Sequence, residues 1–376
     1  MSLKQIFTEE QANYIIDKFG ECWLNSDSTI EYLAPIIDPQ DRSGNSYLIE
    51  KGTKIENVIK TELVALSDIP LECIIDDMAA MKYKFSEKIS NQINVDKKIP
   101  VTERLVGVIQ PQNLKSLKVR PILAGCEITA LEAADRSGTI GAFLRMTPFT
   151  DADGSQVYFI TNYHVVVAIK YKENDLVFQP NNNCYDYSNF IGNVLCGQYY
   201  DNDGKSEYTH DVAFVKLDPR KLKKDPMFTQ DCIIGTGFID NKKILTRTST
   251  RIQGMAEPRI GMKVRLHGIS TVVSEKVEIR SINAIVRVGN LYKSIKESPY
   301  FGKETLLFKK QILTDNISQP GDSGSILINS DGIAVGLHHA GDDHNVSVSN
   351  NLCDIFKNNY EHTQGELQLG LIEFLT

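Results

Sequence analysis

Short apolar runs between clusters of Gly, Asn, Asp and Pro dominate the chain from about residue 115 onward, and they restrict its fold more than any other feature. The runs include GAFLRM (141–146), VYFITN (157–162), DVAFVKL (211–217), SILIN (325–329) and GIAVGL (332–337). Each run is too short for a typical helix but has the length of a strand. Many short strands joined by turns predict a mainly β fold, either a sandwich or a barrel.

The first hundred residues have a different pattern and predict a separate accessory domain, α-rich or mixed, over residues 1–102. The segment TEEQ (8–11) has the spacing of a capping box, in which two side chains bond reciprocally to N–H groups at a helix start. Apolar residues follow at helical spacing and predict an amphipathic helix. They are Ala12, Ile15, Ile16, Phe19 and Trp23. A second apolar rhythm at 55–66 fits either a helix or a strand.

The polar segment ISNQINVDKKIPVTER (89–104) is broken by a proline and is the expected domain boundary. We therefore assign residues 103–376 to the β domain, with one barrel at about 115–220 and a second at about 245–376. The stretch from Asp218 to Ile260 is first basic and then irregular, so it would connect the two β units.

Composition excludes several classes of function. The formal net charge is -7 and the pI is about 5.6, whereas nucleic acid binding needs a concentrated positive surface, so no nucleic acid partner is expected. No run approaches the roughly 18 apolar residues of a transmembrane helix, and the amino terminus lacks the apolar core of a secretory signal, so no membrane association is expected. The seven cysteines are scattered, which predicts free thiols in a reducing, cytoplasmic compartment.

Three polar residues stand beside predicted strands in an informative order. His164 follows the run 157–162, Asp211 begins the run 211–217, and Ser323 comes just before the run 325–329. A serine hydroxyl is a weak nucleophile until an imidazole takes its proton, and a carboxylate on the other ring nitrogen holds the correct tautomer. The order His, Asp, Ser excludes the α/β-hydrolase arrangement, in which Ser comes first, and matches the chymotrypsin-like double β-barrel.

The turn GDSGS (321–325) adds a candidate oxyanion hole. A glycine two residues before the serine lets the backbone N–H groups of Gly321 and Ser323 converge on one point, where a developing oxyanion needs donors. Each feature alone has a purely structural explanation. His164 could be a hydrogen-bonded structural histidine, Asp211 a cap at the start of a strand, and GDSGS an ordinary glycine turn. Their combination and order predict a nucleophilic site.

The segments TNYHVV, HDVAFVKL and GDSGS resemble the histidine, aspartate and serine motifs of trypsin-like peptidases, over about residues 115–376. The resemblance implies a chymotrypsin-like double β-barrel in which His164 is the general base, Asp211 its orienting acid and Ser323 the nucleophile. KVRPILAGCEI, SGTIGAFLR and LVFQPNNNCYDY are similar to segments of the intracellular bacterial branch that includes the plant narrow-leaf trypsin-like proteins. The segment KVRLHGISTVV lacks that branch's G-R-T-T-G, which leaves the detailed shape of the second barrel open.

The same resemblance raises a question about Asp322. In digestive relatives the equivalent aspartate receives a new amino terminus after cleavage, and this forms the oxyanion hole. No I-V-G-G-like start precedes the first predicted barrel. We therefore expect an internal cation or polar group to hold Asp322, the alternative being a different route of activation.

The resemblance also implies a specificity pocket formed by Ile317, Ser318 and His338. Ile317 stands where trypsin keeps an aspartate, so a preference for Lys or Arg is not expected. His338 falls where glutamyl endopeptidases place a histidine that contacts an acidic side chain, so with Ser318 it would favour Glu or Gln before the scissile bond. The alternative is that His338 is a packed polar residue. His210 would point to the strand face opposite Asp211 and is expected to be structural.

The run HHAGDDH (338–344) gathers imidazoles and carboxylates and so raises the alternative of a metal site. Adjacent residues on a strand point to opposite faces, so His338 and His339 cannot easily share one ion. We expect no metal, and the implied mechanism needs no cofactor.

These observations predict a serine endopeptidase that cleaves protein or peptide substrates through an acyl-enzyme. A cytoplasmic protease needs restraint, so the 1–102 domain is expected to gate the site or to dock an activator. A regulated effector of bacterial stress or antiviral defence is the role that this expectation favours. The alternative is a catalytically silent interaction module that keeps the peptidase fold to bind peptides.

Overall fold

The protein is described by a computed structural model of the whole chain, which divides into two compact units, Met1–Leu105 and Val106–Thr376. The structure describes residues 7–26, 30–38, 41, 43–54, 101–106, 122, 124–131, 136–146, 156–167, 175–180, 187–199, 210–218, 238–239, 245–246, 252–266, 268–271, 274, 276–296, 300–342, 345–357, 359–362, 365–368 and 372–374. The apolar rhythm at 55–66 and most of the predicted boundary at 89–104 lie outside these residues.

In the N-terminal unit, helix α1 (Glu9–Ser26) packs on the antiparallel strands β1 (Ile30–Ile37) and β2 (Tyr47–Lys54). Strand β3 (Val101–Val106) follows β2 in the sheet order. The predicted capping box is confirmed, because the Thr8 N–H donates to Gln11 Oε1 at 2.9 Å and the Gln11 N–H to Thr8 Oγ1 at 3.3 Å. The apolar face of the helix is largely buried, so the predicted amphipathic helix is also confirmed.

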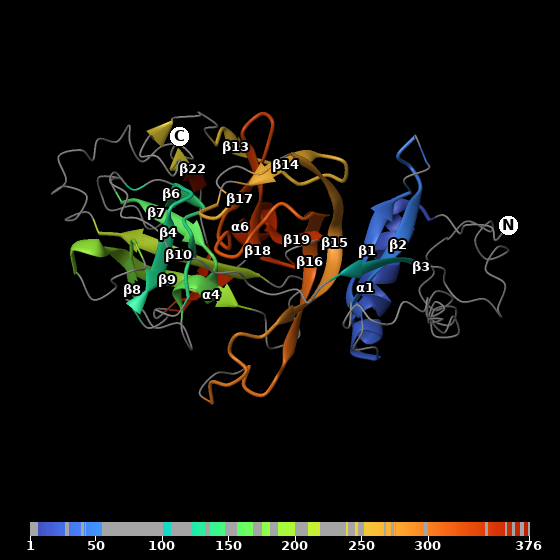
Figure 1. Cartoon of the computed structure of the whole chain (residues 1–376), viewed down its shortest axis with the longest axis horizontal. Coiled ribbons are helices and arrows are strands. Elements are labelled where there is room, and N and C mark those ends of the chain that lie inside the picture. Colours follow the sequence, from blue (N-terminus) through green and yellow to red (C-terminus); the bar gives the residue numbers. More distant parts are fainter. Residues whose placement is uncertain are drawn as a thin grey trace. The chain divides into compact units, whose positions relative to one another are not determined.

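The first sheet of the second unit closes on itself. Most of its strands are the teal, green and yellow-green arrows of Figure 1. Its strands are β4 (Glu127–Ala130), β5 (Gly138–Thr139), β6 (Ala142–Met146), β7 (Tyr158–Thr161), β8 (Leu176–Phe178), β9 (Phe190–Tyr199), β10 (Asp211–Leu217) and the edge strand β22 (Ile372–Phe374). They lie in the order β22-β6-β7-β10-β9-β8-β4-β5. Strands β5 and β6 belong to one continuous segment, so the pairing of β5 with β4 and of β6 with β7 closes the barrel.

The second sheet of this unit is also closed. Its strands are β14 (Lys263–Leu266), β15 (Val277–Gly289), β16 (Thr305–Asp315), β17 (Ile326–Asn329), β18 (Ile333–Gly341) and β19 (Val346–Asn351), with β13 (Gly254–Met255) parallel to β18. Their order is β14-β17-β18-β19-β16-β15, and the additional pairing of β14 with β15 completes the ring.

Three short helices and two small sheets complete the second unit among the described residues. They are α4 (Tyr163–Val166), the 3-10 helix Tyr187–Asn189, α6 (Leu352–Lys357), the pair β11 (Phe238–Ile239) and β12 (Leu245–Thr246), and the pair β20 (Asn359–His362) and β21 (Gly365–Gln368). The predicted mainly β fold with two closed antiparallel sheets and an N-terminal helix is confirmed.

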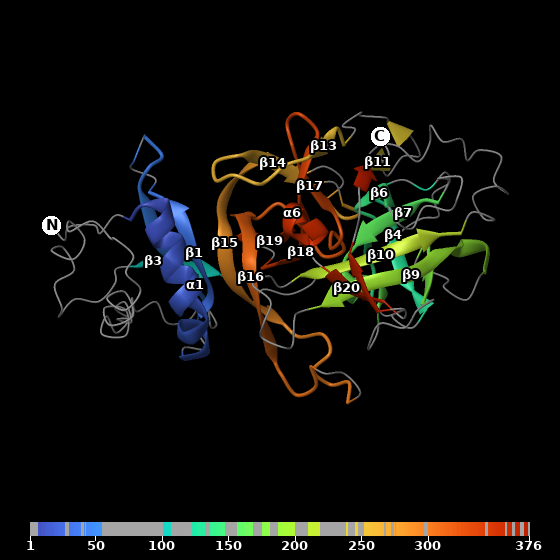
Figure 2. The same cartoon turned by 180° about the vertical axis from the view of Figure 1, so that it is seen from behind.

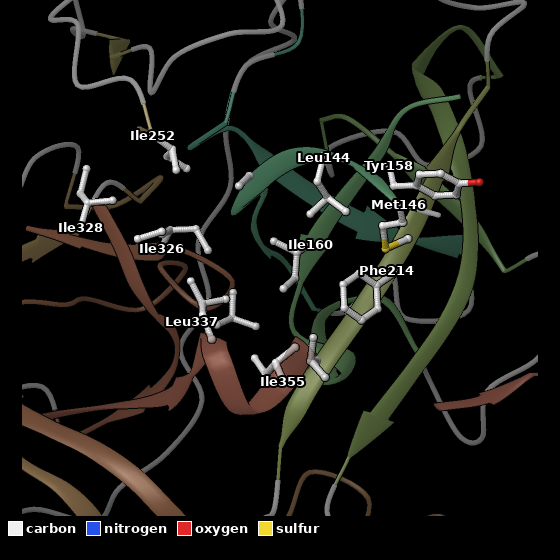
Figure 3. Packing of buried hydrophobic residues seen from close by; sticks show 14 of the residues in the cluster. Leu144, Met146, Tyr158, Ile160, Phe214, Ile252, Ile326, Ile328, Leu337 and Ile355 are labelled. Atoms are coloured by element: carbon white, nitrogen blue, oxygen red, sulfur yellow. The ribbon is translucent and has the colours of Figure 1, made fainter. Parts of the chain in front are cut away.

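One hydrophobic cluster joins the two closed sheets, which Figures 1 and 2 both show side by side. Figure 3 shows Leu144, Ile160 and Phe214 of the first sheet facing Leu337 of the second and Ile355 of α6. All of these side chains are almost completely buried. Truncating a buried side chain of this size to alanine typically costs about 2–5 kcal/mol, so the cluster strongly stabilises the docking of one barrel on the other.

The structure also bears on two features considered in the sequence, membrane-spanning helices and cysteines. No helix in the described part of the chain is long and apolar enough to cross a membrane. Cys22, Cys126, Cys196 and Cys353 are free thiols, while the other three cysteines lie outside the described residues.

Candidate active site

His164 and Asp211 meet because of the register between β7 and β10. Ala213 pairs with Thr161 at the end of β7, so Asp211 continues past that end to the start of helix α4, which carries His164. The Asp211 carboxylate accepts the His164 backbone N–H at 3.1 Å through Oδ1 and contacts the ring Nδ1 through Oδ2. Both side chains are almost fully buried, at 3% and 2% exposure.

Two asparagine side chains hold the backbone of Asp211 where β7 no longer provides a partner. Asn162 donates to the Asp211 carbonyl oxygen at 2.6 Å. Asn350, on β19 of the other barrel, accepts the Asp211 N–H and donates to the same carbonyl, both at 3.2 Å. Sequence reasoning missed both residues. Asn162 lies inside the TNYHVV motif and could have been noticed, whereas nothing in the sequence around Asn350 signals this role.

Ser323 lies in a tight turn between Gly321 and Gly324, whose φ angles are 104° and 98°. Its hydroxyl donates to the backbone carbonyl of His339 at 3.2 Å. Nε2 of His164 is buried and has no hydrogen-bond partner among the described residues. Gly138 lies between helix α4 and the serine turn, because an added Cβ there would lie 2.4 Å from Val165 Cγ2 and 2.6 Å from the Ser323 carbonyl oxygen.

The backbone N–H groups of Gly321 and Ser323 donate to no other group within the described part of the chain. The carbonyls of the same residues are occupied, because Thr139 donates its hydroxyl to Gly321 O at 2.8 Å and its N–H to Ser323 O at 2.7 Å. Hydrogen bonds to its carbonyl oxygens therefore fix the turn. Among the described residues, the N–H groups of Gly321 and Ser323 remain available to bind an oxyanion.

Polar groups of the described residues hold Asp322. Its carboxylate accepts the N–H groups of Ser270 at 2.8 Å, Thr271 at 3.1 Å and Gln319 at 2.8 Å, together with the Thr271 hydroxyl. Within the described residues no cation pairs with it. Burial raises the pKa of Asp322 above its ordinary value, and these hydrogen bonds oppose the rise. The expectation that an internal polar group holds this residue is confirmed.

The three residues of the predicted specificity pocket have different surroundings. Ile317 packs in a hydrophobic cluster of the second barrel. The Ser318 hydroxyl lies 2.7 Å from the Ser347 hydroxyl. His338 is fully buried on β18. Neither ring nitrogen makes a well-aligned hydrogen bond to a described residue, but the ring lies beside the backbone of Val348. Burial, with a smaller contribution from the nearby His164, lowers the pKa of His338 to about 3 although the Val348 backbone contact opposes the change, so the imidazole is neutral at pH 7.

The remaining histidines near the site are buried too. His339 Nε2 lies 2.9 Å from Gln311 Oε1, and its ring packs near Phe308. Burial lowers the pKa of both His339 and His210 to about 3. No group of three or more His, Cys, Asp or Glu is placed to hold a metal ion in the part of the chain that the structure describes, which leaves out Asp343 and His344.

Comparisons with known proteins found likenesses only among solved structures. No protein-family model matches this sequence, and no curated protein matches it. Thermobifida fusca Protease A is similar over 62% of this chain and 94% of its own, with 17% identity and a TM-score of 0.39. Nocardiopsis protease has 17% identity over 62% and 94%, with a TM-score of 0.37. A glutamic acid specific serine protease, described as using a histidine triad in substrate binding, has 15% identity over 62% and 96%, with a TM-score of 0.37.

Proposed function

We propose that the protein is a serine endopeptidase that cleaves protein or peptide substrates through an acyl-enzyme. The observation that carries the proposal is the buried contact of His164 Nδ1 with Asp211, next to a serine turn whose Gly321 and Ser323 N–H groups donate to no group among the described residues. A carboxylate on Nδ1 holds the imidazole in the tautomer whose Nε2 accepts a proton, which is what a serine nucleophile requires.

The proposed steps follow from this arrangement. The Ser323 hydroxyl turns from the His339 carbonyl towards His164, gives its proton to Nε2 and attacks the substrate carbonyl. The N–H groups of Gly321 and Ser323 stabilise the oxyanion of the tetrahedral intermediate. His164 then protonates the leaving amine, and water, activated by the same imidazole, hydrolyses the acyl-enzyme.

A fluorophosphonate probe tests the proposal directly, because it forms a covalent bond only with an activated serine. We expect the full chain to be labelled and Ser323→Ala to remain unlabelled under the same conditions. Mass spectrometry of the labelled peptide should place the adduct on Ser323. Labelling of neither protein would favour the second candidate, a peptidase-fold module that binds peptides without cleaving them.

A preference for Glu or Gln before the scissile bond is proposed from His338. Its neutral imidazole offers one donor and one acceptor in a dry environment, which suits a carboxylate or an amide and repels neither. We expect His338→Leu to lower kcat/KM for such substrates by about 10- to 100-fold, the effect of one hydrogen bond to a polar or charged group. Peptides with leucine at the same position serve as the control and should lose little.

A peptide library treated with the wild-type protein measures this preference without assumptions. Cleavage mainly after Lys or Arg would contradict the proposal, as would an equal loss for all substrates in the variant. Regulation through residues 1–102, a cytoplasmic location and a role in stress or antiviral defence stay predictions of the sequence.

A further inference from the structure

The connection between β14 and β15 lies against the turn that carries Ser323. Four described residues of this connection, Gly268 to Thr271, approach the segment from Gln319 to Gly324. They are about fifty positions away in sequence, as the separation of 52 between Ser270 and Asp322 shows. Their hydrogen bonds reach Pro320 and Asp322. These residues directly precede Gly321 and Ser323, so they set the direction of the two N–H groups.

Ser270 fixes the peptide that contains the Gly321 N–H. The Ser270 hydroxyl donates a hydrogen bond to the carbonyl oxygen of Pro320. In a planar trans peptide the C=O and the following N–H point in opposite directions. Holding the Pro320 oxygen therefore aims the Gly321 N–H away from Ser270.

The carboxylate between the two donors is fixed by the same turn. Oδ1 of Asp322 accepts the N–H groups of Ser270 and Thr271 at 2.8 and 3.1 Å, and Oδ2 accepts the Thr271 hydroxyl. Asp322 is fully buried, so water cannot donate hydrogen bonds to its carboxylate. The N–H and hydroxyl groups of Ser270 and Thr271 donate them instead. Because Asp322 lies between Gly321 and Ser323 in the chain, anchoring it restrains both neighbouring peptides.

Two further contacts make the arrangement specific. The Ile269 N–H donates to Thr139 Oγ1 at 3.2 Å, and that hydroxyl donates to the Gly321 carbonyl, so the turn is also tied to the first barrel. A Cβ on Gly268 would lie 2.2 Å from Asp322 Oδ1, so only glycine allows the turn to come this close.

We infer that Ser270 and Thr271 are positioning residues that hold the Gly321 and Ser323 N–H groups in their donor orientation before substrate arrives. They do so with hydroxyl and backbone donors of one internal turn, and neither a cleaved amino terminus nor a cation is required. The inference rests on the proposed serine peptidase function, because it assigns a role within that site.

The test measures how fast each protein reacts with the fluorophosphonate probe over a range of probe concentrations. Saturation separates the apparent binding constant from the maximal rate of bond formation, in which the phosphoryl oxygen develops charge. We expect Ser270→Ala and Thr271→Val to lower the maximal rate by about 10- to 100-fold, approaching the loss of one oxyanion donor, with binding nearly unchanged. Ser270→Thr keeps a hydroxyl and should recover most of the rate.

Ser274→Ala is the matched control within the same connection. Its hydroxyl accepts the Leu266 N–H at 2.9 Å, so the change also removes a hydrogen bond, one whose other partner is in β14 and not in the Ser323 turn. We expect a similar loss of thermal stability and an unchanged labelling rate. Thermal unfolding of every variant checks the fold, and if Ser270→Ala does not fold, the partly exposed Thr271 position provides the test.

The outcomes separate this inference from the proposed function. If the wild type is not labelled at Ser323, the proposed function fails and the inference falls with it. If the wild type is labelled and folded Ser270→Ala and Thr271→Val react at the wild-type rate, the inference alone is wrong. A fall in the rate for Ser274→Ala as large as that for Ser270→Ala would also overturn it, since the effect would then be structural.

Discussion

Replacing Asp211 by asparagine is expected to lower kcat by about 10⁴-fold while leaving the fold intact. The asparagine has the same shape, so its oxygen can keep the 3.1 Å hydrogen bond from the His164 N–H. Its amide group then faces Nδ1 and donates to it, which favours the tautomer protonated on Nε2. An imidazole in that form cannot accept the proton of Ser323, so the nucleophile stays inactive.

Steady-state kinetics and thermal unfolding of the same preparation check this result. Asp354→Asn is the matched control, because Asp354 is a mostly buried carboxylate on α6 that lies near Lys357 rather than near His164. We expect the control to keep the wild-type kcat. If Asp211→Asn retains activity within tenfold of the wild type, the contact of His164 with Asp211 does not serve catalysis.

Gly324→Ala is expected to have the largest effect on stability of any single change beside the site. Gly324 has a φ of 98°, and an added Cβ would lie 2.2 Å from the Thr139 carbonyl oxygen and 2.5 Å from Thr161 Oγ1. Strain at positive φ and the clash with a neighbouring strand add, so we expect a loss of roughly 3 kcal/mol or more in the free energy of unfolding. Relief of the clash would move Ser323, so labelling by the probe should also fall.

Substitutions at two other glycines separate the effect of backbone strain from the effect of the steric clash. Gly302 has a φ of 76° but nothing within 4 Å of an added Cβ, so Gly302→Ala should lose only about 1 kcal/mol from conformational strain. At Gly254 the nearest atom to an added Cβ is 3.9 Å away and φ is not positive, so Gly254→Ala should be nearly neutral. Denaturant unfolding measures all three variants. A loss at Gly324 no larger than that at Gly302 would contradict the close packing of the two barrels at this turn.

The elements that could be predicted from the sequence are those whose residues follow a local rule. The helix of the N-terminal unit was predictable because a capping box and an apolar face repeat along one segment. Strands β1 and β2 were missed. β1 is buried at nearly every position and contains Glu31 and Pro35, so it lacks the alternation that identifies a half-exposed strand.

Local residue patterns were enough to predict the strand-rich character of the larger unit and the order in which histidine, aspartate and serine stand beside its strands. Apolar periodicity and turn residues act within a few positions of one another, so they can be read along the chain. The hydrogen bonds that hold these residues in place, in contrast, depend on contacts between distant parts of the chain. Asn350 bonds to Asp211 across 139 positions, and Thr139 to Gly321 across 182. Such contacts exist because two closed sheets dock on one another, and no local pattern specifies which polar side chains the docking brings together.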